Sequence, residues 1–147
     1  MASVYVVAMI ISAGAARGAI IDRWRQVDGR GPQALMVGPA PVTPLRRDVI
    51  IDAGDHYETG AFTWWPRSVR FDQGQVPKND GDPRVAVARD APNIRAFLVW
   101  ARFPFWTLAP VPGGTRVTVG DMRFAGGPGM AQRNFTESVI VPDSRGP

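Results

Sequence analysis

The stretch LRRDVIIDAGDHYETGAFTWW, residues 45–65, decides the fold class of this chain. Apolar and polar side chains alternate along residues 45–53 and again along residues 57–65, which is the two-residue period of a strand that buries one face. The segment Gly54-Asp55-His56 between them has the composition of a turn. Two antiparallel strands joined by a short turn are therefore predicted.

Further strands are expected on both sides of this pair. Apolar segments with strand composition lie at residues 34–37, 69–71, 105–109, 116–124 and 134–141. Pro112-Gly113-Gly114 has the composition of a hairpin turn between two of them. Three prolines between Gly38 and Pro44 indicate an extended, rigid connector before the central pair. The sequence thus predicts a mostly antiparallel sheet.

Helices are expected at the amino end and in the middle of the chain. Residues 2–16 carry no charge and precede a stretch rich in arginine, which favours an apolar helix over residues 2–27. Asp82-Pro83 is typical of a helix start, and Pro92 marks a second one. One or two short helices are thus expected within residues 83–102.

Together these elements define an α+β fold. A mostly antiparallel sheet of about five to seven strands over residues 34–124 is expected to be packed by the amino-terminal helix and the short central helices. The length of 147 residues, with 45% hydrophobic and 20% charged side chains, suits a single domain over residues 1–147. Residues 125–147 are expected to form a tail with a last strand.

Composition excludes several classes of chemistry. The chain has no cysteine, so disulfides, thiolate nucleophiles and thiolate zinc sites are excluded. His56 is the single histidine, so a histidine-rich metal site within one chain is excluded as well. The formal net charge is +4 and the arginines are scattered, which gives little support to nucleic-acid binding. A mild basic excess also suits an anionic lipid surface.

The apolar amino end allows more than one interpretation. It is too short to cross a bilayer unaided, because a spanning helix needs roughly 20 apolar residues. A secretory signal is a rival, since Ala13-Gly14-Ala15 resembles a cleavage site, but no positive charge precedes the apolar run. Gly14 and Gly18 have GxxxG spacing. We interpret that spacing first as close packing of the helix onto the sheet and second as membrane pairing.

Two regions resemble a known family. In the carboxyl half, Phe97-Leu-Val-Trp-Ala-Arg-Phe-Pro-Phe105 is followed by Gly113-Gly-Thr-Arg-Val-Thr-Val-Gly-Asp-Met-Arg-Phe124. Upstream, Gly38-Pro-Ala-Pro-Val-Thr-Pro-Leu-Arg-Arg-Asp48 is followed by Tyr57 and Gly60. In this order, and across most of the chain, they resemble the inner-membrane-associated, metal-dependent hydrolase family of LexA-binding type.

The resemblance implies that this chain is the carboxyl-terminal, extramembrane part of a bacterial inner-membrane protein. It implies a longer parent whose membrane helices carry the histidine and carboxylate motif. A divalent metal would then belong to the parent, with no metal site or cofactor in this chain. The residues expected to form a binding or structural network are Arg46, Arg47, Asp48, Tyr57, Arg102, Phe103, Pro104, Asp121 and Arg123.

Asp55, His56 and Asp121 are the candidate catalytic residues of an alternative, a free-standing divalent-metal hydrolase. An Asp–His pair can act as base and orienter, but no serine is placed as its nucleophile, and we favour a surface-turn role for His56. Four acidic residues of the central pair offer oxygen ligands: Asp48, Asp52, Asp55 and Glu58. The first two stand about 13 Å apart along a strand, which favours a solvated strand edge.

Asp121 and Arg123 fall on the inward face of their predicted strand. Charges on a core face need partners, so we expect an Asp–Arg network, joined by Arg102 or Arg47, that fixes strand register. The alternative is an anion-binding or catalytic pocket, because a guanidinium presents a planar fork to carboxylate or phosphate.

The chain also has a large stock of aromatic side chains. It includes Trp64, Trp65, Trp100, Phe103, Phe105 and Trp106. Most are expected in the core. Any that stay exposed beside Arg67 and Arg102 would suit a membrane interface, where amphipathic rings settle at headgroup level.

The leading functional hypothesis is a structural, accessory domain that folds against the membrane part of a hydrolase. Its expected partners are the membrane helices of a longer parent or the membrane surface. The rivals are the metal hydrolase described above and a peripheral module that binds anionic lipid or a partner protein.

Overall fold

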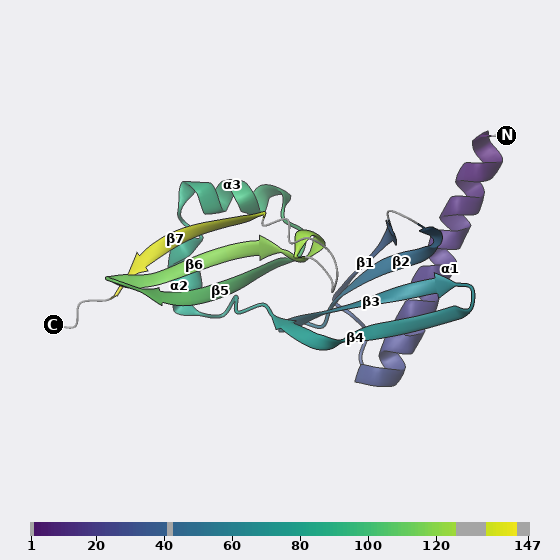
Figure 1. The fold of residues 1–147 in the computed structure, drawn as a ribbon, viewed down its shortest axis with the longest axis horizontal. Coiled ribbons are helices and arrows are strands. Elements are labelled where there is room, and N and C mark those ends of the chain that lie inside the picture. Colours follow the sequence, from purple (N-terminus) through teal and green to yellow (C-terminus); the bar gives the residue numbers. More distant parts are fainter. Residues whose placement is uncertain (1, 41–42, 126–134, 144–147) are drawn as a thin grey trace. The chain divides into compact units, whose positions relative to one another are not determined.

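The computed structural model describes residues 2–40, 43–125 and 135–143. It confirms the α+β class: seven antiparallel strands form one sheet of four strands and one of three, accompanied by an amino-terminal helix and short central helices (Figure 1). The chain divides into two compact units, residues 1–75 and 76–147. Each unit has a hydrophobic cluster of its own. Two sheets in two units thus take the place of the one sheet and one core expected from the sequence.

The first unit consists of one long helix and the four-stranded sheet. Its elements are α1 (Ala2–Asp28), β1 (Ala34–Ala40), β2 (Thr43–Asp52), β3 (His56–Trp64) and β4 (Arg67–Pro77), with strand order β1-β2-β3-β4. The connector expected at residues 38–44 is largely strand, because β1 extends to Ala40 and β2 begins at Thr43, with a register shift after Pro39. Residues 41–42 lie outside the described ranges.

One face of this sheet is covered by α1. Ala16, Ile20 and Trp24 follow one another at four-residue spacing, so they share one face of the helix, and all three are buried. The ring of Trp24 meets Phe71 edge-on, with 5.5 Å between centroids. Opposite them the sheet contributes buried Leu35, Val49, Ile51 and Phe62. The covered part of α1 thus begins near its middle.

The second unit consists of two short helices and the three-stranded sheet. Its elements are α2 (Pro83–Ala88), α3 (Pro92–Trp100), β5 (Pro104–Val111), β6 (Gly114–Asp121), the short 3-10 helix η1 (Met122–Phe124) and β7 (Thr136–Pro142), with strand order β5-β6-β7. The predicted helix start is present, since Asp82 caps α2 by accepting the Arg84 N–H at 2.8 Å. The strand expected over residues 116–124 ends at Asp121, where the chain turns into η1.

Candidate functional site

The amino-terminal half of α1 carries exposed apolar side chains between residues 7 and 11. Val7, Met9, Ile10 and Ile11 are all exposed, and each isoleucine retains 66% of its accessible surface. In Figure 1 this half of the helix extends beyond the strands of its sheet. Large apolar patches on soluble surfaces mark contact sites for proteins or membranes. This half of α1 is therefore the first component of the candidate site.

Gly14 and Gly18 face away from the sheet. A Cβ atom added to either glycine would meet nothing within 4 Å among the described residues. The expectation that they allow close packing of helix on sheet is therefore wrong. The face of α1 that meets the sheet is instead formed by Ala16, Ile20 and Trp24, which lie on the other side of the helix.

Two further exposed apolar side chains lie at the end of the sheet that meets this half of α1. Arg47 of β2 donates through Nη2 to the Ser12 hydroxyl of α1 at 3.3 Å, which places Ser12 beside the start of β2. Leu45, two residues before Arg47, is 54% exposed. Trp65 sits in the turn between β3 and β4 and is 86% exposed. We call Val7, Met9, Ile10, Ile11, Leu45 and Trp65 the apolar end.

Arginines flank the apolar end. Strand register sets Arg46 opposite Thr63 and Arg47 opposite Phe62, so both arginines lie within a few residues of the β3–β4 turn. Arg67 follows that turn and is exposed. Arg46 lies 3.5 Å from the Asp48 carboxylate, so its charge is partly balanced. The flank is therefore basic, as suits contact with an anionic surface.

Arg47 differs from its neighbours in being buried. It retains only 7% of its accessible surface, and its Nε atom is buried with no hydrogen-bond partner in the part of the chain that the structure describes. The one side-chain hydrogen bond that Arg47 makes within the described residues is to the Ser12 hydroxyl. A buried charge is ordinarily paired, because desolvating an ion without a partner costs several kcal/mol. Arg47 is thus a cation whose partner the described residues do not supply.

The predicted catalytic pair lies at the opposite end of the same sheet. His56 Nδ1 lies 2.6 Å from the Asp55 carboxylate, and its Nε2 lies 3.6 Å from Glu58. The hydrogen bond from His56 holds the pKa of Asp55 below its usual value. Asp121, the third expected member, belongs to the other unit. Within the described ranges, no group of three or more His, Asp or Glu side chains is placed to hold a metal ion.

The acidic residues around this pair have structural contacts. Asp52 accepts the Gly54 N–H at 2.9 Å and so stabilises the β2–β3 turn. Glu58 accepts the Gln75 amide at 3.1 Å across the edge of the sheet. Tyr57, expected in the binding network, is buried at 2% exposure and faces the opposite side of β3 from Glu58. The expected solvated strand edge is wrong for Asp52 and Glu58, because β2 and β3 are the inner strands of the sheet and the Glu58 side chain is only 15% exposed.

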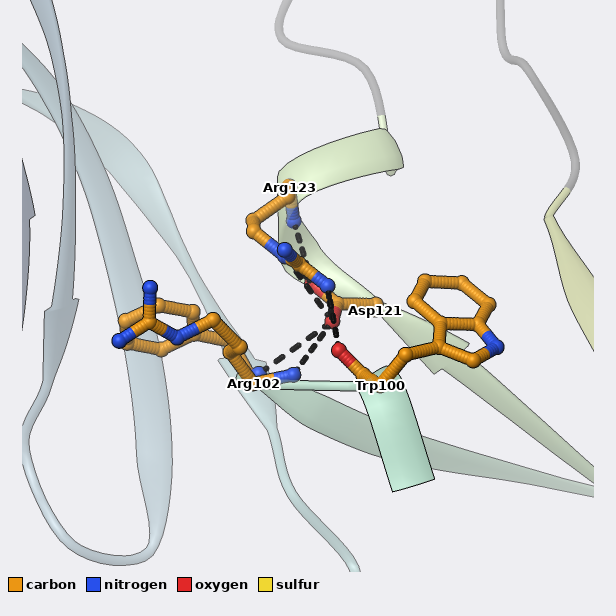
Figure 2. Close-up of polar contacts among 5 residues, drawn as sticks. Trp100, Arg102, Asp121 and Arg123 are labelled. Atoms are coloured by element: carbon orange, nitrogen blue, oxygen red, sulfur yellow. Dashed lines mark hydrogen bonds and ion pairs between the residues drawn. The ribbon is translucent and has the colours of Figure 1, made fainter. Parts of the chain in front are cut away.

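The Asp121–Arg123 network expected from the sequence is present in the second unit (Figure 2). Asp121 is 1% exposed, and its carboxylate accepts the backbone N–H groups of Arg102 at 2.7 Å and Arg123 at 2.9 Å. The Arg123 guanidinium donates to the same carboxylate at 2.8 Å and to the Trp100 carbonyl at 2.9 Å. The network therefore ties the end of β6 to the segment that joins α3 and β5.

Electrostatics of this network favour the ionised carboxylate. Burial alone would raise the pKa of Asp121, but the hydrogen bonds from Arg123 and from the Arg102 backbone outweigh it and hold that pKa below 3.8. Arg102 contributes only its backbone, and Phe103 and Pro104 follow it into β5. Arg47, the other arginine expected to join, instead contacts Ser12.

Aromatic rings gather beside this network. The Arg123 guanidinium lies over the Trp100 ring, 5.7 Å from its centroid, and Trp100 in turn meets Phe97 and Phe135. Between α3 and the start of β7 these rings line an open groove of about 610 Å³, closed at one end by Asn93 and Glu137. Trp106, by contrast, is fully buried in the core. Fewer of the six aromatic residues lie in the core than expected: Phe103 and Trp106 are buried, Trp64 and Phe105 are half-buried, and Trp65 and Trp100 are exposed.

Comparisons with known proteins return no match. No family model, no curated protein and no solved structure matches this chain. Separately, no helix in the described part of the chain is both long and apolar enough to span a bilayer. The candidate site therefore has to be interpreted from its own chemistry.

Sequence reasoning named Arg46 and Arg47 but missed the apolar end as a unit. One face of β2 carries Leu45, Arg47 and Val49, because they are two residues apart. The alternation in the sequence therefore already placed Arg47 on the face that meets α1. Trp65 was assigned to a strand, and it lies in the turn instead. The gathering of α1, Leu45 and Trp65 depends on tertiary packing, which the local pattern does not specify.

Proposed function

We propose that this chain is a membrane-associated accessory domain that attaches to a bilayer surface through the apolar end. The observation that carries the proposal is the coincidence of three features at one end of the first unit. These are an uncharged helix with exposed isoleucines, an almost fully exposed tryptophan, and flanking arginines. Tryptophan favours the membrane interface, and arginines favour anionic headgroups.

The mode of attachment is insertion into the interface. A helix of 14 residues, from Ala2 to Ala15, is about 21 Å long at the usual rise, whereas the hydrocarbon core is about 30 Å thick. Such a segment suits shallow burial among headgroups and the first acyl carbons. Trp65 and Leu45 would then meet the same interface from the sheet.

Within the family that the sequence resembles, this attachment would hold the chain against the membrane part of a hydrolase. The chain would contribute packing and position there, with the divalent metal held by the parent. We propose no catalytic role for Asp55, His56 and Asp121, because the Asp121 carboxylate already accepts hydrogen bonds from two backbone amides and one guanidinium.

The test is flotation with vesicles of phosphatidylcholine containing phosphatidylglycerol. The wild-type chain should float with the vesicles, and its tryptophan emission should shift to the blue as Trp65 leaves water. The double variant Ile10→Gln, Ile11→Gln should bind about a hundredfold or more weakly, since each buried isoleucine contributes roughly 1.5–3 kcal/mol.

The matched control is Val99→Gln on α3. Val99 is 88% exposed and apolar but lies in the second unit, so its replacement should leave flotation unchanged. Size-exclusion chromatography with light scattering is run in parallel. A wild-type chain that stays with buffer at low salt, or a stable dimer whose formation the isoleucine variant abolishes, would refute membrane attachment in favour of a protein contact.

A further inference from the structure

A cation buried beside the apolar end has no anionic partner among the described residues. Arg47 retains 7% of its accessible surface, so more than nine-tenths of the residue is buried. Its Nη2 donates to the Ser12 hydroxyl at 3.3 Å, and its buried Nε has no partner among the described residues. The neighbouring Asp48 carboxylate is turned to the other sheet face, where it lies 3.5 Å from Arg46.

A comparison with Asp121, another buried charged residue, shows what is unusual about Arg47. Asp121 is surrounded by donors from a guanidinium and from the backbone. Arg47 has one neutral hydroxyl, although a guanidinium carries five N–H donors in a rigid fork. That fork matches the oxygens of a phosphate group and binds them in pairs.

The position of Arg47 favours a lipid headgroup as the source of the phosphate. Ser12, its contact, follows directly on Ile10 and Ile11, the exposed isoleucines of α1. Leu45 precedes Arg47 by two residues on the same strand face. A phosphate reaching Arg47 would therefore lie at the depth where these apolar side chains enter a bilayer, which is the depth of lipid headgroups.

We propose that Arg47 and the Ser12 hydroxyl bind the phosphate of an anionic phospholipid when the apolar end enters the interface. This inference rests on the proposed function. Arg46 and Arg67 add a basic surround, partly balanced by Asp48. The positive charge that remains favours a headgroup with net negative charge over a zwitterionic one, because the arginines repel the ammonium group of the latter.

The experiment compares Arg47→Met with Arg67→Met, which removes the same charge from an exposed position at the same end. Flotation is measured with phosphatidylcholine vesicles alone and with vesicles that contain phosphatidylglycerol. The wild type should prefer the anionic vesicles about tenfold, and Arg47→Met should lose most of that preference while keeping its binding to phosphatidylcholine.

Salt separates the two arginines. The contribution of exposed Arg67 should vanish at high salt, because the Debye length falls to about 3 Å at 1 M. The contribution of Arg47 should persist, because its phosphate contact is desolvated. Equal losses for the two variants at every salt concentration would show that Arg47 acts only as general surface charge, and would overturn the inference.

A second readout needs no membrane. Soluble dihexanoyl-phosphatidylglycerol, below its micellar concentration, should raise the Tm of the wild type more than that of Arg47→Met. Without lipid, Arg47→Met should melt at the wild-type temperature or above it, since removal of an unpaired buried charge relieves its desolvation. A marked fall in Tm without lipid, with no difference in its presence, would mean that Arg47 is a structural residue whose partner is bound water.

The outcomes for the two proposals are distinct. If the wild type binds neither kind of vesicle, the proposed function itself fails. If it binds both kinds equally, and Arg47→Met does the same, membrane attachment stands and the phosphate site is refuted.

Discussion

Asp121 in the second unit and Arg47 in the first are both buried, but their hydrogen-bond partners differ in number. Asp121 in the second unit is 1% exposed and has donors from Arg123 and from two backbone amides within 2.9 Å. Arg47 in the first unit is 7% exposed and has one hydroxyl at 3.3 Å. The Asp121 carboxylate has its donors within the chain, whereas the buried Nε of Arg47 has no hydrogen-bond partner among the described residues.

The difference separates structural charges from binding charges. A carboxylate whose acceptor sites are filled holds secondary structure in place and has little left to offer a ligand. A guanidinium with donors unpaired among the described residues can bind an anion, and in our proposal the anion approaches from the exposed apolar surface beside it. Apolar groups do not follow this contrast, because Trp100 and Phe135 of the second unit remain 41% and 53% exposed although their rings meet.

The largest expected effect on stability follows from removal of the Asp121 carboxylate. Asp121→Ala should lower the free energy of unfolding by about 3–5 kcal/mol, because it leaves Arg123 and several backbone amides without their acceptor. Urea titration followed by circular dichroism measures the change. Asp80→Ala, at an exposed position in the same unit, is the control and should be nearly neutral. A loss under about 1 kcal/mol would contradict a structural role for the network.

The next effect distinguishes two arginines of that network. Arg123 contributes its guanidinium, whereas Arg102 contributes only its backbone N–H. Arg123→Met should therefore lower the free energy of unfolding by about 1.5–3 kcal/mol, and Arg102→Met should change it by less than about 0.5 kcal/mol. Equal losses of unfolding free energy in the same urea titration would mean that the Arg102 guanidinium also stabilises the network.

Acid should weaken the same network. The pKa of folded Asp121 lies below 3.8, its value in an unfolded chain, so its ionised form stabilises the fold fully above that pH. This contribution is lost as the pH falls through the lower, folded pKa. Wild type should therefore lose more stability than Asp121→Asn between about pH 5 and about pH 2.5. Parallel losses in the two proteins would show that other carboxylates, such as Asp82 with its pKa of about 2, dominate acid unfolding.

The sequence predicted most elements because their determinants are local. Asp82-Pro83 specifies the start of α2, and alternation along residues 45–53 specifies β2 and its buried face. Pro112-Gly113-Gly114 likewise specifies the hairpin of β5 and β6, where Gly113 adopts a φ of 82°. In each case a few neighbouring residues carry the whole signal.

The division into two units was missed because it depends on pairing between distant strands. Alternation tells which face of a strand is buried but not which strand lies beside it. Residues 73–82 have a polar, turn-rich composition, which predicts a loop, whereas β4 continues to Pro77 and the boundary between the units falls at residues 75 and 76. The partner of Arg47 was predicted wrongly for a related reason, since its contact with Ser12 requires α1 to lie over the start of β2.

The smallest expected effect concerns the outer face of α1. Gly14→Ala and Gly18→Ala should each raise the free energy of unfolding by about 0.5–1 kcal/mol, because alanine favours the helix and its Cβ meets no described atom within 4 Å. Gly60→Ala in β3 is the opposite control, since its Cβ would collide with the Arg70 carbonyl. If the α1 variants were destabilised like Gly60→Ala, the outer face would already be packed in the isolated protein. The proposal that α1 offers a free apolar surface to the membrane would then be lost.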